Sequence, residues 1–292
     1  GTEVLDYLAK VDSVESQPPA AWMKNIVHFR GGFTANDYIT FDSALSEYQA
    51  IAEDTSFFGN VTKFVKSDGS IIEPAASDSV NDLINEGVTL MTFFGHAYGA
   101  GFDITIYAPS NYDWHGKFPT IIGNSCYTGN IHQYDASSSS EQFVLNHNAG
   151  AIAFISSVDL GLSEFLRPFT SAFYTSFSQV NYGLGIGEHM RYAENSSLAT
   201  GVIYDLTTAE EMTLHGDPTI VMNSPELPDL DVHQPDVSLI PAQVNADVDT
   251  FQVRVIFRNN GRGTNQSFQV ALQRSLVSEG VVLPLQSQTV SM

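Results

Sequence analysis

The chain has 292 residues, of which 43% are hydrophobic, and its 33 Asp and Glu residues against 12 Lys and Arg residues give a formal net charge of −21. Such an acidic chain is a poor match for nucleic acid, which attracts basic surfaces. The length favours two domains, and no apolar stretch is long enough to cross a membrane. The single cysteine excludes an intramolecular disulfide.

The first hundred residues alternate between helical and strand-like patterns. Helices are expected over Thr2–Glu15, Tyr38–Asp54 and Ser77–Glu86, where apolar residues recur at helical spacing. Short apolar runs predict strands over Trp22–Phe29 and Val61–Val65. This alternation predicts an α/β fold with a mostly parallel sheet flanked by helices.

Two longer apolar runs have the same design and come next in the chain. The run from Val88 ends in Phe93-Phe-Gly-His-Ala, and the run from Pro119 ends in Gly-Asn-Ser-Cys-Tyr. Apolar runs bounded by glycine are typical of central parallel strands, which are buried on both faces. Ligands bind beyond the carboxyl ends of such strands, so we expect His96 and Cys126 to lie there on neighbouring strands.

A thiol and an imidazole at one site point to nucleophilic catalysis. The thiolate is the reactive form of cysteine, and a neighbouring imidazole takes the thiol proton. The backbone N–H groups of Ala97 and Cys126 are candidates for stabilising an oxyanion. The alternative is structural, because a lone cysteine is often a small buried hydrophobe and a histidine after a strand often has only a local partner.

Other polar residues near these strand ends suggest further roles. Asp103, in the loop between the two runs, is a candidate for orienting His96 or contacting substrate. Asp159, which follows a predicted strand at 149–157, is a candidate for binding a basic side chain. His96, His132, His147 and Asp135 match no zinc spacing, so no metal ligand is assigned. The serine run at 137–140 lacks the strand-to-helix elbow of a serine nucleophile.

The rest of the chain divides into two regions. Helices over Ser163–Val180 and Gly183–Asn195 and a closing strand over Met212–Met222 complete the first region. Prolines and acidic residues then indicate a linker over 225–235. From Asp236 apolar residues alternate with polar ones, and Asn259–Gly263 has the composition of a hairpin turn. The predicted units are 1–224, the linker 225–235, and an all-β domain over 236–292.

Several segments resemble a known family, and they are Phe93–Gly99, Gly123–Gly129, Ser140–Ser157, Leu184–Ala193 and Leu214–Val221. They are similar, in the same order, to blocks of the gingipain family of cysteine peptidases, family C25, over about residues 2 to 223. The resemblance implies a caspase-like fold and a cysteine-type endopeptidase with Cys126 as nucleophile and His96 as base. It also implies protein or peptide substrates, no required cofactor, and export from the cell or to a bacterial surface, in processing or sorting of exported proteins.

The resemblance also bears on the ends of the chain and on bound ions. Gingipains carry an immunoglobulin-like β-sandwich after the catalytic domain, and 236–292 is similar to a truncated one. They also have a subdomain before the helix that matches Thr2–Glu15, so this chain is expected to be part of a larger multidomain protein. Structural calcium is expected from the acidic composition and the family's habit.

The chain departs from the family pattern at one position that matters for catalysis. Gingipains have a Glu directly before the two glycines that match Gly31 and Gly32, and this Glu contacts the catalytic histidine. In this chain the matching position is Arg30. Arginine cannot accept a hydrogen bond. The alternative function is therefore a catalytically weak homologue that serves as a surface scaffold or adhesion module. Asp42 matches loosely an acid that binds the basic substrate side chain in arginine-specific members.

Overall fold

The computed structural model describes residues 1–66, 73–74, 78–97, 101–106, 108–132, 138–222, 225–245, 247–273, 275–276, 280–282 and 286–290. Its centre is a six-stranded sheet with the strand order β2-β1-β4-β6-β7-β8. The strands are β1 Asn25–Arg30, β2 Asn60–Val65, β4 Leu90–Phe94, β6 Thr120–Asn124, β7 Ala153–Ser157 and β8 Met212–Gly216. All neighbours are parallel except β7 and β8, which run antiparallel. The fold is α/β with a mostly parallel sheet, as the sequence predicts.

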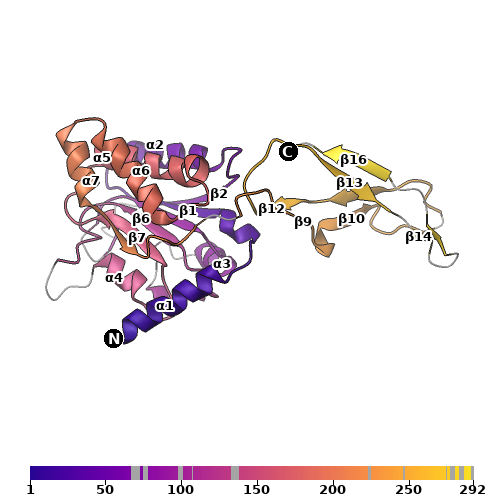
Figure 1. Ribbon diagram of the computed structural model, residues 1–292, viewed down its shortest axis with the longest axis horizontal. Coiled ribbons are helices and arrows are strands. Elements are labelled where there is room, and N and C mark those ends of the chain that lie inside the picture. The colour runs from indigo at the N-terminus through magenta and orange to yellow at the C-terminus, as the bar shows by residue number, and fades with distance from the viewer. Residues whose placement is uncertain are drawn as a thin grey trace.

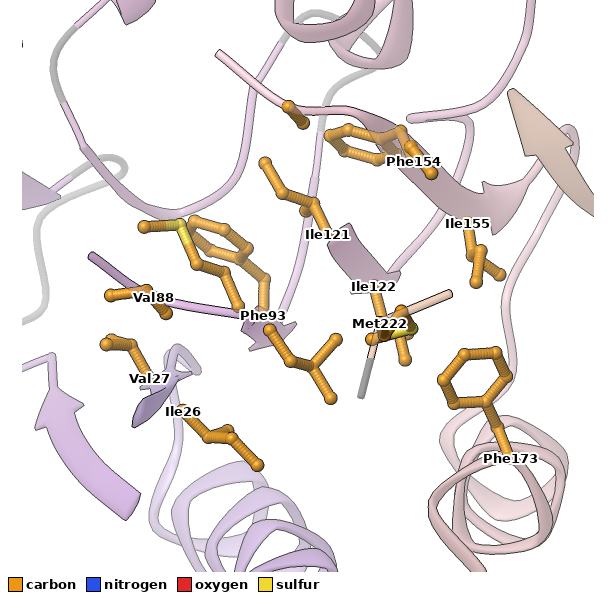
Figure 2. Packing of buried hydrophobic residues seen from close by; sticks show 14 of the residues in the cluster. Ile26, Val27, Val88, Phe93, Ile121, Ile122, Phe154, Ile155, Phe173 and Met222 are labelled. Atoms are coloured by element: carbon orange, nitrogen blue, oxygen red, sulfur yellow. The ribbon is translucent and has the colours of Figure 1, made fainter. Parts of the chain in front are cut away.

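The two central strands owe their position to their composition. Every residue of β4 and β6 is buried, because helices cover both faces of the sheet. The apolar side chains of the sheet and the covering helices form one cluster, part of which Figure 2 shows. The labelled members are Ile26, Val27, Val88, Phe93, Ile121, Ile122, Phe154, Ile155, Phe173 and Met222.

Helices cover the two faces of the sheet in two groups (Figure 1). One face carries α2 Ala35–Ala52, α5 Ser163–Thr175, α6 Ile186–Leu198 and α7 Ile203–Glu211, and the other carries α1 Thr2–Glu15, α3 Asp78–Glu86 and α4 Ser139–Val144. A π-helical turn, Ser176–Val180, continues α5. No described helix is long and apolar enough to cross a membrane.

Most predicted elements are present, with shifts at their ends. Helix α1 matches its predicted bounds, and α2 begins earlier than expected because the Thr34 side chain caps it. The strand predicted from Trp22 starts at Asn25, after a 3-10 turn at Ala21–Lys24. Helix α7 was not predicted. Its buried residues are Asp205, Thr208 and Ala209, so it lacks the apolar stripe by which a helix is detected.

The region after the sheet forms small antiparallel pairs of strands. They are β9 Leu230–Asp231 with β12 Arg258–Asn259, β10 Val237–Ile240 with β11 Gln252–Val255, β13 Phe268–Leu272 with β16 Gln286–Val290, and β14 Ser275–Leu276 with β15 Val281–Val282. A further short pair, β3 Glu73–Pro74 with β5 Ile104–Thr105, is parallel. Burial alternates along β11 with the predicted period of two.

The expected hairpin at Asn259–Gly263 is wrong. The strand before it pairs with β9 and the strand after it pairs with β16, so the turn does not join two partners. Instead it contacts the α/β region: the Gly263 N–H donates to the Ser56 carbonyl at 2.8 Å. Lys24 Nζ donates to the Gly261 carbonyl at 2.7 Å.

Candidate active site

The register of the sheet brings the ends of β4 and β6 together. Phe94 and Asn124 are register partners, and the Gly95 N–H donates to the Asn124 carbonyl at 3.3 Å. His96 and Cys126 each follow two residues beyond this pair. The chain therefore places an imidazole and a thiol on adjacent strand ends, at the carboxyl edge where α/β proteins bind ligands.

Cys126 lies in a tight turn that leaves its thiol accessible. Its side chain is partly exposed, and its Sγ is 3.7 Å from the Gly161 carbonyl oxygen, which accepts its weak hydrogen bond. The next residue, Tyr127, has a left-handed φ of 59°, which turns the chain sharply after the strand. The Tyr127 N–H donates to the Asp159 carbonyl at 2.8 Å and holds this turn against the end of β7.

The His96 ring is held by contacts on two sides. Its plane is stacked on Phe33, with centroids 4.8 Å apart and an angle of 9°, and Phe41 approaches it edge-on at 5.6 Å. The ring also forms a hydrogen bond, because its Nε2 lies 3.3 Å from Oδ2 of Asp37. The side chain is 42% exposed, so the ring remains open to substrate.

Asp37 was not among the residues predicted for the site. It lies in the first turn of α2, where it forms a reciprocal capping box with Thr34 and also accepts from the Phe33 N–H at 3.0 Å. Burial favours the neutral acid, but the hydrogen bonds from Phe33, His96 and Thr34 outweigh it and lower the pKa of Asp37. The Thr-x-x-Asp pattern was the available signal, and it predicts a helix start rather than a contact with His96.

Asp103 does not orient the His96 ring or face substrate, which corrects that prediction. It is fully buried, its carboxylate accepts from the Gly32 N–H at 2.7 Å, and it lies 3.5 Å from Lys66 Nζ. A Cβ on Gly31 or Gly95 would overlap its Oδ1, so the glycines are needed to admit a buried carboxylate. This packing accounts for Gly31 after β1 and for Gly95 after β4.

The described contacts of the Arg30 side chain are with residues other than His96. Its guanidinium lies over the Tyr38 ring at 4.4 Å, and it donates to the Lys66 carbonyl at 3.3 Å. The neighbouring Lys66, which is buried, lies with its Nζ over the Phe33 ring at 4.0 Å. Position 30, where the resemblance leads us to expect a Glu, is therefore occupied by an arginine with structural contacts. The carboxylate next to the imidazole comes instead from α2.

The two remaining acidic candidates have different surroundings. Asp42 forms an exposed ion pair with Lys63 of β2 at 2.8 Å, which occupies its carboxylate away from the strand ends of β4 and β6. Asp159 lies beside the turn that carries Cys126: its carbonyl accepts from the Tyr127 N–H at 2.8 Å, and its side-chain hydrogen bond raises the pKa of the Tyr127 hydroxyl. Burial raises the pKa of the nearby Glu211, and the charge of Asp159 raises it further. Asp159 and Glu211 thus make the rim acidic on this side.

Two backbone donors are available near the thiol. Within the described part of the chain, no acceptor is found for the N–H of Ala97 or of Cys126, although the neighbouring Asp103 and Tyr127 amides are paired. Free N–H groups at this edge are suited to an oxyanion.

The described residues contain no group of three or more metal-ligating side chains. Of the histidines considered for a metal, His147 pairs with Asp6 at 2.8 Å and His96 with Asp37. Asp135 lies outside the described residues.

Comparison with known proteins gives both a family and a fold. The model of Peptidase family C25 matches residues 1–223. A crystal structure of the Arg-specific cysteine proteinase gingipain R (RgpB) aligns with a TM-score of 0.57 and 13% identity over 93% of this chain, which spans 62% of that chain. A complex of the pro- and mature domains of Porphyromonas gingivalis RgpB aligns with a TM-score of 0.60 and 12% identity, over 99% of this chain and 66% of that one.

A third structure, described only as a protease, aligns with a TM-score of 0.61 and 10% identity, over 99% of this chain and 72% of that one. A comparison with curated protein sequences finds no match. At these identities the structural likeness establishes the shared fold, and the family assignment rests on the C25 match.

Proposed function

Since the chain belongs to peptidase family C25, we propose that it is a cysteine endopeptidase in which Cys126 and His96 form the catalytic dyad. The observation that carries this proposal is the register of β4 and β6, which sets the two side chains equally far beyond Phe94 and Asn124. Both residues are partly exposed at this edge of the sheet, which a cysteine and a histidine that serve only the core would not need.

In this mechanism His96 takes the thiol proton and the thiolate of Cys126 attacks the scissile carbonyl. The C–S bond forms as the carbonyl π electrons move to oxygen, and the N–H groups of Ala97 and Cys126 stabilise that oxyanion. His96 then gives the proton to the leaving amine, which departs as the C–N bond breaks. Water, deprotonated by His96, attacks the acyl-enzyme and releases the acid and the thiol.

The proposed substrates are proteins or peptides, in processing or sorting of exported proteins at a bacterial surface. The relative RgpB is described as Arg-specific. In this chain, Asp159 and Glu211 supply negative charge beside Cys126, so we propose that a basic side chain of the substrate lies against this side of the rim. The region 236–292 is proposed to be part of an immunoglobulin-like domain of a larger chain, and structural calcium stays a prediction.

The test is the rate at which iodoacetamide alkylates Cys126 between pH 4 and 10, in the native protein and in His96→Ala. We expect the native alkylation rate to reach half its maximum well below pH 8.5, which is about the pKa of an unperturbed thiol. In His96→Ala the pH of half-maximal alkylation is expected to return to about 8.5. His147→Ala, which removes an exposed histidine far from the thiol in sequence, is the control. If the native protein and His96→Ala give the same alkylation profile, the dyad is absent and the scaffold function becomes the better explanation.

A further inference from the structure

We propose that Asp37 is the positioning residue of His96: its carboxylate accepts the hydrogen of Nε2, fixes the ring, and leaves Nδ1 to take the proton of Cys126. This inference rests on the proposed function of the dyad. It replaces the glutamate that the resemblance placed before the paired glycines, at the position occupied by Arg30, with a carboxylate from the start of the next helix.

The geometry that supports this role involves three contacts on one ring. Asp37 Oδ2 is 3.3 Å from Nε2, Phe33 is stacked on one face, and Phe41 touches the ring edge-on. Asp37 itself cannot swing away easily, because its carboxylate also accepts from the N–H groups of Phe33 and Thr34 at 3.0 Å each. A carboxylate held by two backbone donors is a rigid support for an imidazole.

The charge of Asp37 decides which ring nitrogen carries the hydrogen. Its hydrogen bonds lower its pKa despite burial, so it is an ionised carboxylate at neutral pH and can only accept. Nε2 must then carry the hydrogen in their bond, and in the neutral imidazole Nδ1 is left as the acceptor. This is the form that a general base requires.

The other charged groups around the ring do not offer this contact. Asp103 is buried against Gly32 and Lys66, and only its backbone N–H reaches His96, donating to its carbonyl at 2.8 Å. Lys66 Nζ lies over the Phe33 ring at 4.0 Å, and the Arg30 guanidinium lies over the Tyr38 ring. Among the described residues, Asp37 is thus the anion that contacts the imidazole.

The experiment measures the same alkylation profile in Asp37→Asn and Asp37→Glu. The Asn variant keeps an oxygen for the backbone donors but loses the charge, and its amide N–H can donate to Nε2 and leave the hydrogen on Nδ1. We expect half-maximal alkylation to move about one unit towards higher pH in Asp37→Asn. Asp37→Glu restores the charge and is expected to recover most of that shift.

A matched control separates positioning from helix capping. Thr34→Ala removes the side chain that accepts from the Asp37 N–H, and so weakens the same helix start without removing the carboxylate. It is expected to lower the stability of the protein and to leave the alkylation profile at its native position. Asp37→Ser, which keeps a short acceptor without a charge, is the second uncharged variant if Asp37→Asn does not fold.

The outcomes distinguish this inference from the proposed function. If native protein and His96→Ala give the same profile, the dyad itself is refuted. If they differ while Asp37→Asn and Asp37→Ser follow the native profile, the dyad stands and the role of Asp37 is overturned. Equal shifts in Thr34→Ala and Asp37→Asn would also overturn it, since Asp37 would then act only through the helix start.

Discussion

Single buried residues give this protein a defined response to acid. His28 is fully buried in β1, and its Nε2 shares a hydrogen bond with the Tyr174 hydroxyl at 2.9 Å. Burial, aided by the charge of Lys63, lowers the pKa of His28 to about 3, and burial lowers that of His189 to about 4 against weaker effects that raise it. Both histidines are therefore neutral in the folded protein at pH 5, whereas an unfolded histidine titrates near 6.5.

The sign of the effect follows from proton binding. Between pH 6.5 and 4 the unfolded chain binds protons at these two positions and the folded chain does not, so the free energy of unfolding falls as the pH falls. Each histidine contributes a slope of about 1.4 kcal/mol per pH unit. Substitution of one of them should remove its part of the slope.

We expect His28→Gln, which keeps a polar atom near the Tyr174 hydroxyl, to reduce the pH dependence of stability between pH 6.5 and 5 by about 1.4 kcal/mol per unit. Urea unfolding at several pH values measures this slope. The exposed His132→Gln serves as the control and should leave it unchanged. An unaltered slope in His28→Gln would mean that His28 binds its proton in the folded state.

Some residues of the candidate site could be predicted from the sequence, and others could not. His96 and Cys126 follow buried runs of the same kind, so their common location was predictable. Asp103 was predicted at the site as a loop carboxylate, yet the structure buries it against Lys66. The ion partner is 37 positions away in the sequence, and no local pattern links the two.

Among the elements, α1 is attached to the α/β region partly by a buried lysine. Lys10 is 1% exposed, and its Nζ donates to the carbonyls of Val144, Ala149 and Ala151 at 2.6, 3.1 and 2.9 Å. Two of these carbonyls belong to the segment that joins α4 to β7, and Val144 ends α4. A single side chain therefore closes the C-terminal end of α4 and docks α1.

We expect Lys10→Met to lower the free energy of unfolding by about 2 to 4 kcal/mol, because it leaves these buried carbonyls without a donor. Lys63→Met, which removes a partly exposed ion pair with Asp42 and a hydrogen bond to the Ser46 hydroxyl, should change it by less than about 1 kcal/mol. Denaturant unfolding compares the two variants. Equal small effects would show that water replaces the ammonium group of Lys10.

For the whole molecule, the two regions differ in how they are stabilised. The α/β region has a continuous core, whereas no described apolar residue after Met222 is buried. The C-terminal strands project from the α/β region (Figure 1) and are connected to it at the turn Asn259–Gly263. Contacts at this turn, rather than a core of their own, hold the described strands in place.

Gly263 is the position at which this connection can be tested. A Cβ there would overlap the Thr55 carbonyl, so we expect Gly263→Ala to release the turn. Limited proteolysis should then cut faster within 225–245, while the alkylation of Cys126 remains native. Ser267→Ala, at an exposed position, is the control. Unchanged proteolysis would show that the C-terminal strands are held by other contacts.

The sequence by itself determined the α/β class, the mostly parallel sheet, the bounds of α1 and the residues at the ends of β4 and β6. These features depend on local periodicity and on buried runs, which are present in the chain before it folds. The tertiary structure decided the partner of His96, which lies 59 residues away, the burial of Asp103, and the pairing of β12 with β9. Such contacts depend on how segments distant in sequence meet, and on space and charge that only the packed molecule defines.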